Sequence, residues 1–230
     1  MSQPLLLIFA GPNGSGKSSC YEALTKTLPP KLQANIVNPD VFALKLTQEL
    51  GFNNTNELNR DIKAKVDIEA GKLALKAREQ LLANKEDLII ETTAASPSLL
   101  RLITQAKLQG YFTRIVFMML CFHELNITRI KHRVSLGGHF IDDVTVQRRY
   151  DRAINLLPQL ITAADHFQLF DNSTLPQQIL LKTANHDLMV NTAALSTLAP
   201  SEQATINHLL SKLNLQRSGF FSSFLASSSP

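Results

Sequence analysis

The stretch Leu5-Leu6-Leu7-Ile8-Phe9-Ala10, followed at once by Gly11-Pro12-Asn13-Gly14-Ser15-Gly16-Lys17-Ser18, decides the fold of this chain. The first six residues are all apolar and predict a buried strand, and the residues after the second run have helical character. Glycines at this spacing allow successive backbone N–H groups to form a cradle for phosphate oxygens. The positive end of the following helix favours the same negative charge. The sequence therefore predicts a phosphate-binding loop (P-loop).

This loop predicts a bound nucleotide and assigns roles to its side chains. Lys17 can reach the β- and γ-phosphates, and the Ser18 hydroxyl can ligate Mg²⁺. The residues expected to contact the nucleotide are Gly11, Pro12, Asn13, Gly14, Ser15, Gly16, Lys17, Ser18 and Ser19.

Composition limits the function classes. The 230 residues are 44% apolar and 18% charged, as in a folded globular protein. The net charge of +4 suits an anionic ligand and is too small to indicate nucleic acid by itself. Cys20 and Cys121 have no metal or redox spacing, and the N-terminal apolar run is too short to span a membrane. We expect a cytoplasmic protein that binds neither membrane nor nucleic acid.

Strand and helix patterns alternate along the chain, which predicts an α/β fold: a P-loop kinase-like parallel sheet with helices on both faces and a helical lid. We expect a kinase domain over 1–190 with its lid at about 123–152, and a C-terminal helix with a Ser-rich tail over 191–230. The expected strands are 5–10, 34–38, 87–90, 111–121 and 167–170, with an edge hairpin in 179–190. The expected helices are 17–28, 40–50, 57–84, 98–109, 123–136, 142–164 (interrupted or ended near Pro158) and 201–214.

Two acidic residues follow successive predicted strands. Asp40 lies in Asn38-Pro39-Asp40, and Glu91 begins Glu91-Thr92-Thr93. Ligands of open α/β sheets bind at the carboxyl ends of the strands, where an acid can hold Mg²⁺ or accept a hydroxyl proton. The alternatives are structural: Asp40 as a helix-start residue and Glu91 as the cap of the next helix.

Two basic segments flank the turn Gly137-Gly138-His139. The first carries Arg129 and Arg133, and the second carries Arg148, Arg149 and Arg152. Guanidinium groups on such a lid match the charge that gathers on a phosphoryl group in transfer. A solvated basic face or a nucleic-acid stripe would give the same charge run, but few aromatic residues are interleaved with it. In the turn itself, His139 is a candidate substrate contact.

The sequence Asn84-Lys85-Glu86-Asp87 spells N-K-x-D, a guanine-reading motif. That motif must follow a strand near the base, whereas here it precedes one. We interpret it as a coincidence.

Six segments in order then resemble a known family: G-P-N-G-S-G-K-S, N-P-D, E-T-T, R-V-S-L-G-G-H, R-R-Y and F-D-N-S, between Gly11 and Ser173. The chain resembles the zeta toxin family of P-loop kinases, particularly its short chromosomal branch. The resemblance covers roughly 4–190. It implies phosphorylation of a UDP-activated amino sugar such as UDP-N-acetylglucosamine, with ATP and Mg²⁺ as cofactors. It also implies a small helical antitoxin partner.

Carried onto this chain, the resemblance implies Asp40 as the base for the sugar hydroxyl and Lys17 and Ser18 as ligands of ATP and metal. It implies substrate contacts at Glu91 and Thr93. Arg133 and Arg148 are the best matches to the lid arginines, with Arg149 as a further candidate at the substrate. Two other functions remain open at this point: a nucleotide-gated protein-interaction ATPase, and a kinase of another small hydroxyl compound such as a nucleoside or nucleotide.

Overall fold

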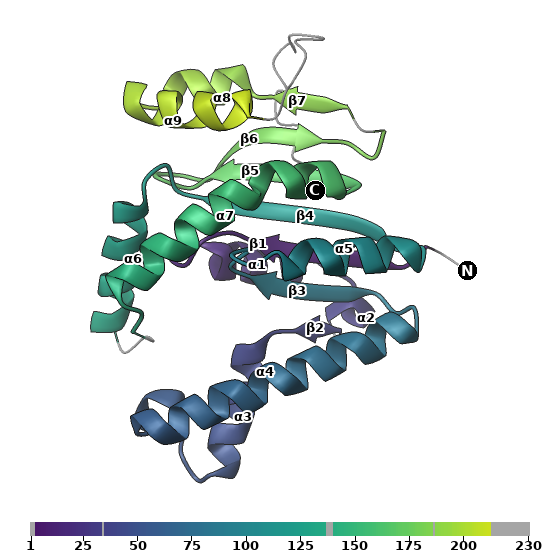
Figure 1. The fold of residues 1–230 in the computed structure, drawn as a ribbon, viewed down its shortest axis with the longest axis vertical. Helices are drawn as coiled ribbons and strands as arrows, with labels where there is room; N and C mark the ends of the chain where they lie inside the picture. Colours follow the sequence, from purple (N-terminus) through teal and green to yellow (C-terminus); the bar gives the residue numbers. More distant parts are fainter. Residues whose placement is uncertain (1–2, 34, 137–139, 186, 213–230) are drawn as a thin grey trace.

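Strand β1 (Leu5–Ala10) lies inside a seven-stranded sheet formed by the described residues, between β3 and β4. The structure is a computed structural model that describes residues 3–33, 35–136, 140–185 and 187–212. The strand order is β2-β3-β1-β4-β5-β6-β7 (Figure 1). The first five strands in this order run parallel, and β6 and β7 run antiparallel at one edge. The predicted α/β fold with a parallel sheet is confirmed.

The remaining strands are β2 (Ile36–Val37), β3 (Leu88–Thr92), β4 (Phe112–Met119), β5 (His166–Asp171), β6 (Gln177–Lys182) and β7 (Leu188–Val190). The helices are α1 (Lys17–Thr25), α2 (Pro30–Gln33), α3 (Pro39–Glu49), η1 (Thr55–Glu57), α4 (Arg60–Ala83), α5 (Ser98–Leu108), α6 (His123–Ser135), α7 (Asp143–Ala163), α8 (Thr192–Thr197) and α9 (Pro200–Ser211). No helix among them combines the length and the apolar character of a membrane span.

Both faces of the sheet are covered, and β1 shows why. Side chains alternate between the two faces of a strand. Leu6 and Ile8 accordingly pack into the larger core with α5, α7 and α9, whereas Leu7 and Phe9 pack into a smaller core beside α1 and α2. An uninterrupted apolar run is therefore what a strand buried on both faces requires.

Helices α3 and α4 form an arm that extends away from the sheet at the bottom of Figure 1. The arm has a small core of its own, built from Ala43, Leu58, Val66 and Ala70. The arm and the α6–α7 pair stand on either side of the carboxyl end of β1 (Figure 1).

Several predicted boundaries were wrong. Helix α7 continues through Pro158, which was expected to interrupt or end it. Proline removes one backbone N–H donor, but Leu156, Leu157 and Leu160 are buried around it, and this packing outweighs the lost hydrogen bond. The first helix ends at Thr25 rather than at position 28, and Pro30 begins the short helix α2 instead of only ending α1.

Candidate functional site

Three glycines give the P-loop its shape. Gly11, Gly14 and Gly16 have φ angles of 139°, 77° and 90°, a region that other residues rarely adopt. A Cβ at Gly11 would collide with the carbonyl oxygen of Met118 on β4, and one at Gly14 would lie 2.8 Å from the backbone oxygen of Asn126. Glycine is therefore required at these positions for two reasons: the backbone has a positive φ angle, and neighbouring backbone atoms occupy the space of a Cβ atom.

Two asparagine amides hold the loop from outside. Asn126 on α6 is fully buried and donates from Nδ2 to the carbonyl of Asn13 at 2.6 Å. Asn172, just after β5, donates from Nδ2 to the carbonyl of Ser15 at 2.9 Å. These bonds fix the carbonyls of Asn13 and Ser15 and thereby the path of the loop backbone.

Lys17 is a buried cation at the start of α1. It is 7% exposed, and its Nζ donates to the Pro12 carbonyl at 2.8 Å. Burial lowers the pKa of Lys17 from 10.5 to about 8, while the charges of Glu91 and Asp40 raise it and that of Arg133 lowers it. The ammonium group therefore has much to gain from an anion, because an opposite charge would offset its desolvation.

A chain of hydrogen bonds connects the P-loop to the two predicted carboxylates. The Ser18 hydroxyl donates to Oε1 of Glu91 at 2.9 Å, and Nδ2 of Asn38 donates to Oε2 of the same carboxylate at 3.3 Å. Asn38 also caps α3 by accepting from the backbone N–H of Asp40 at 2.9 Å. Asp40 therefore occupies the first turn of α3, fixed relative to Glu91 through one asparagine.

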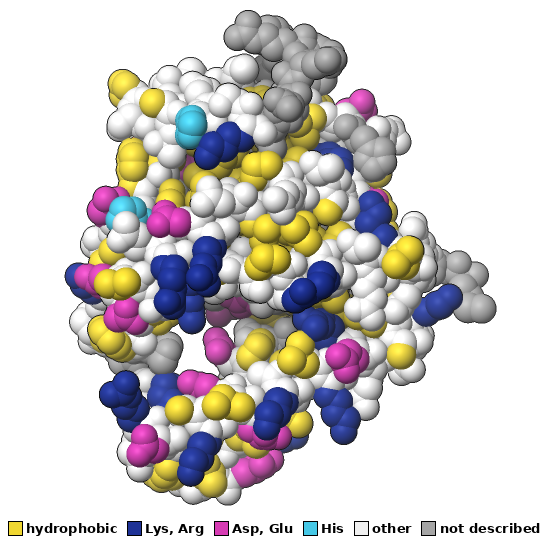
Figure 2. Space-filling view, in the orientation of Figure 1, with side chains coloured by type: hydrophobic (Ala, Val, Ile, Leu, Met, Phe, Trp, Pro, Cys, Tyr) yellow, Lys and Arg dark blue, Asp and Glu magenta, His cyan; other side chains and the backbone are white. Residues whose placement is uncertain are grey.

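These groups line one cavity of about 830 Å³ above the carboxyl end of β1. Figure 2 shows the hollow between the arm and the rest of the molecule, with Lys and Arg side chains gathered along its upper rim. Among the lining residues are P-loop members, both predicted carboxylates, three arginines and two further charged residues of α4: Asn13, Gly14, Gly16, Lys17, Ser18, Ser19, Asp40, Lys63, Asp67, Glu91, Thr93, Arg129, Arg133 and Arg149.

The arginines differ in position. Arg133 on α6 and Arg149 on α7 line the P-loop cavity, and Nη1 of Arg149 donates to Oδ1 of Asn13 at 3.2 Å. Arg148 lines an adjoining cavity instead. The hydroxyl of Tyr150 lies 3.0 and 2.9 Å from the carbonyl oxygens of Leu120 and Cys121, and this contact anchors α7 beside the end of β4.

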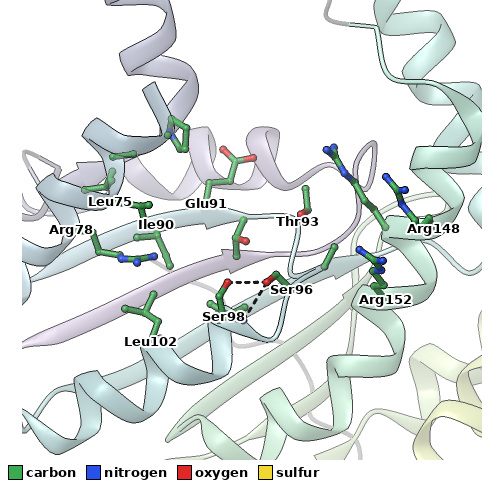
Figure 3. A pocket seen from close by; sticks show the side chains of 18 residues that line it. Leu75, Arg78, Ile90, Glu91, Thr93, Ser96, Ser98, Leu102, Arg148 and Arg152 are labelled. Carbon is green, nitrogen blue, oxygen red and sulfur yellow. Dashed lines mark hydrogen bonds between the residues drawn. The ribbon is translucent and has the colours of Figure 1, made fainter. Parts of the chain in front are cut away.

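The second cavity measures about 530 Å³ and shares Pro39, Glu91, Thr92, Thr93 and Arg149 with the first. It extends between α4 and the start of α5, with Arg148 and Arg152 at its α7 side (Figure 3). The two cavities therefore meet at the Glu91–Thr93 segment, so that one ligand on the P-loop and another beside α5 would approach each other there.

The structure brings together most of the residues predicted from the sequence. Gly11, Pro12 and Ser15 are buried residues of the P-loop, and Ser15 is fully buried. The predicted turn 137–139, with the candidate contact His139, and the tail from 213 onward lie outside the described residues. Asp87 of the N-K-x-D sequence accepts from the backbone N–H of Leu5, at the far end of β1 from the P-loop.

Sequence reasoning missed the residues that support the site. Asn126 gave no signal, because a single polar residue in a basic amphipathic helix is unremarkable. Asn172 was visible only as part of the F-D-N-S segment, without a role. Nη2 of Arg129 donates to the carbonyls of Asn172 and Ser173, at 2.8 and 3.1 Å, which no spacing rule would predict.

The residues of this site fit a nucleoside triphosphate with its metal ion. The cradle is built from glycines that no side chain could replace, and the charge of Lys17 is desolvated. The Ser18 hydroxyl donates its hydrogen bond to Glu91, which leaves its oxygen lone pairs for a hard cation such as Mg²⁺. Magnesium needs few protein ligands when phosphate oxygens supply the others.

Known proteins similar to this chain were found by sequence and by structure. An uncharacterised protein of Haemophilus influenzae is 26% identical over 144 residues, which cover 63% of this chain and 91% of the relative. A chain of the PezAT chromosomal toxin–antitoxin system of Streptococcus pneumoniae has a similar fold, with a TM-score of 0.55 and 17% identity over 93% of this chain and 87% of that one.

The AvrRxo1-ORF1:-ORF2 complex has a similar fold too, with a TM-score of 0.62 and 16% identity over 92% of this chain and 76% of that one. A structure of that complex with ATP gives a TM-score of 0.61. At these identities the likeness concerns the fold. The sequence model of the zeta toxin family, however, matches residues 1–187, which is most of the chain. The chain therefore belongs to the zeta toxin family, and it is a phosphotransferase with a P-loop kinase fold.

Proposed function

We propose that the protein uses ATP and Mg²⁺ to phosphorylate a hydroxyl group of a UDP-activated amino sugar, with UDP-N-acetylglucosamine as the acceptor. The observation that carries this proposal is the single cavity that Lys17, Asp40 and Glu91 share with Arg133 and Arg149. A phosphate cradle, a carboxylate and two guanidinium groups around one space are the parts that phosphoryl transfer to an alcohol requires.

In this proposal Asp40 is the general base. Its carboxylate accepts the hydroxyl proton while the hydroxyl oxygen attacks the γ-phosphorus, and the bond from that phosphorus to the β-phosphate oxygen breaks to release ADP. The position of Asp40 supports this role, because Asn38 holds the first turn of α3 next to the Ser18–Glu91 pair. The exposed Asp40 side chain is open to an acceptor from the cavity.

Lys17, Arg133 and Arg149 stabilise the charge on the transferred group. Lys17 would exchange the Pro12 carbonyl for phosphate oxygens, which supply the countercharge that burial denies it. Mg²⁺, when bound through Ser18, neutralises charge on the β- and γ-phosphates. Glu91 orients the Ser18 hydroxyl, and we add this role to the substrate contact expected for Glu91 and Thr93.

The decisive experiment incubates the protein with ATP, Mg²⁺ and a panel of sugar nucleotides, nucleosides and nucleotides, and reads the products by mass spectrometry. We expect UDP-N-acetylglucosamine to gain one phosphate. Phosphate on a nucleoside or nucleotide alone would identify a kinase with another acceptor. Slow ATP hydrolysis with no phosphorylated product, together with a protein partner whose affinity depends on ATP, would identify a nucleotide-gated interaction module.

We also propose that a small helical antitoxin restrains this activity, since one similar fold comes from a toxin–antitoxin system. The proposal predicts that a small protein encoded beside this one binds it and lowers phosphate transfer. Expression of the chain without that neighbour should slow growth of the host, and Lys17→Met should abolish the effect. Equal growth with and without the wild-type chain would contradict it.

A further inference from the structure

The second cavity contains a basic residue that the transfer chemistry does not use. Arg78 lies in the C-terminal half of α4, far along the helix from Lys63 and Asp67 of the P-loop cavity. Figure 3 shows its side chain entering the cavity from the side opposite Arg148 and Arg152, beside Leu75, Ile90 and Leu102. The cavity is therefore basic at both ends and apolar along part of its wall.

The α4 face that lines this cavity has an unusual pattern. Gly71, Ala74, Leu75 and Arg78 recur at helical spacing and all line it. A Cβ built on Gly71 meets no atom within 4 Å, so the small residue leaves open space rather than making room for a packed neighbour. The stripe consists of small and apolar residues and ends in one arginine.

The Arg78 guanidinium has an unmet hydrogen-bonding requirement. Its Nε atom is buried and has no hydrogen-bond partner, and no carboxylate lies within ion-pair distance of Arg78 among the described residues. Burial lowers the pKa of Arg78, and the neighbouring Glu79 raises it only in part. Buried donors in native proteins nearly always have partners, and Arg78 lines a cavity whose ligand could meet the hydrogen-bonding capacity that the protein leaves unused.

Other charges around the cavity do not satisfy Arg78. The lining residues include four arginines and a single carboxylate, Glu91, whose two oxygens already accept from Ser18 and Asn38. The cavity as a whole is therefore electropositive, and an anion gains from entering it.

We propose that Arg78 is a specificity-determining residue that binds an anionic oxygen group of the acceptor, such as a phosphate or diphosphate, remote from the hydroxyl that is phosphorylated. This inference rests on the proposed function and extends it. The acceptor lies along the second cavity, with its anionic group at Arg78 and its body on the apolar wall. Its reacting hydroxyl points through the shared Glu91–Thr93 segment toward Asp40.

The test compares Arg78→Met with Lys76→Met, a matched control that removes one positive charge from an exposed position of the same helix. The P-loop is first saturated with a non-hydrolysable ATP analogue and Mg²⁺, and pyrophosphate is then titrated calorimetrically. We expect Arg78→Met to weaken pyrophosphate binding by about tenfold to a hundredfold, as loss of a charged hydrogen bond does, and Lys76→Met to bind as the wild type does.

Thermal unfolding separates a ligand-binding arginine from a structural one. An unpaired, half-buried guanidinium costs stability, so Arg78→Met should melt at the same temperature as the wild type or higher. A structural arginine would lower it. Arg78→Lys keeps the positive charge but lacks the paired N–H donors of the guanidinium group, so it should recover part of the pyrophosphate affinity.

The outcomes distinguish this inference from the proposed function. If no sugar nucleotide gains phosphate but Arg78→Met still loses pyrophosphate binding, the acceptor assignment fails and the anion site stands. If UDP-N-acetylglucosamine is phosphorylated and Arg78→Met leaves its KM unchanged, the anion site is overturned. Absence of pyrophosphate binding to the wild type, or a lower melting temperature with unchanged affinity, overturns it as well.

Discussion

Lys17 and Lys182 are equally buried, each 7% exposed, yet the fold treats them differently. Lys182 on β6 donates to three backbone carbonyls, those of Ile161, Thr162 and Ala164, at 2.6 to 3.0 Å. Lys17 donates to one carbonyl, that of Pro12. Lys182 uses all three of its N–H donors to satisfy carbonyl groups at the end of α7. Lys17 lines a cavity and uses one donor, so its other two donors can bind a ligand.

Unmet hydrogen-bonding capacity distinguishes the buried polar groups of the candidate site from those that only stabilise the fold. At the edge of the sheet, the hydrogen-bonding capacity of Lys182 is met within the protein. At the carboxyl end of β1, the buried groups remain incompletely satisfied: Lys17 has a single partner and Ser15 Oγ has none. Incomplete satisfaction of buried polar groups has an energetic cost, and the bound nucleotide would recover it.

The largest expected effect is on catalysis at Lys17. Lys17→Met should lower kcat for phosphate transfer by about a thousandfold, because it removes a preorganised charge from the phosphoryl group. Its melting temperature should not fall, since the substitution removes a desolvated cation. Steady-state kinetics and differential scanning calorimetry measure the two effects, with Lys26→Met at the exposed end of α1 as the control. A large loss of stability in Lys17→Met would make this lysine structural, like Lys182.

Lys182→Met should show the reverse pattern. Leaving three carbonyls at the end of α7 without their donor should reduce the free energy of unfolding by roughly 2–4 kcal/mol. Activity per folded molecule, measured well below the melting temperature, should equal that of the wild type. Urea denaturation checks the first expectation, with Lys65→Met on the exposed side of α4 as the control. Unchanged stability would remove the distinction between the two lysines.

A smaller effect concerns pH. The pKa of Lys17 is lowered to about 8 without nucleotide, and phosphate oxygens should raise it. Binding of ATP at a pH above 8 should therefore take up protons, and affinity should fall as pH rises past 8, by up to about tenfold per unit. Below pH 8 Lys17 is already protonated and contributes no dependence. Calorimetry in buffers of different ionisation enthalpy measures the uptake, which Lys17→Met should abolish. Equal uptake in that variant would assign it to another group.

Much of the fold could be predicted because the strongest signals are local. The P-loop, the apolar strands and the stripe of α4 depend on short spacings, and the edge hairpin was also expected. Pro158 misled the prediction because its effect is decided by the packing of α7 against the core, which no local rule contains. Helix α8 was missed for the same reason: its six residues carry little periodicity and owe their position to contacts with β6.

The residues of the candidate site could be predicted only where they belong to short sequence motifs. Lys17 was found through the P-loop motif, and Asp40 and Glu91 were found because each follows a predicted strand. The sequence could not separate Arg148 from Arg149, which are adjacent and both line the second cavity, although only Arg149 also lines the P-loop cavity. Helical geometry turns neighbouring side chains by about 100°, so a shift of one residue decides whether an arginine reaches the P-loop cavity. Asn126 lacked any signal because its partner, Asn13, is distant in sequence, and Arg78 lacked one because the cavity it lines is formed by segments that are distant in sequence.

The most direct test of the account compares Asp40→Asn with the wild type in ATP affinity and in the single-turnover rate of phosphate transfer to UDP-N-acetylglucosamine. We expect unchanged ATP affinity and a transfer rate reduced by about 10²–10⁴, because asparagine keeps the shape of the side chain and cannot accept the proton. A transfer rate equal to that of the wild type would contradict it.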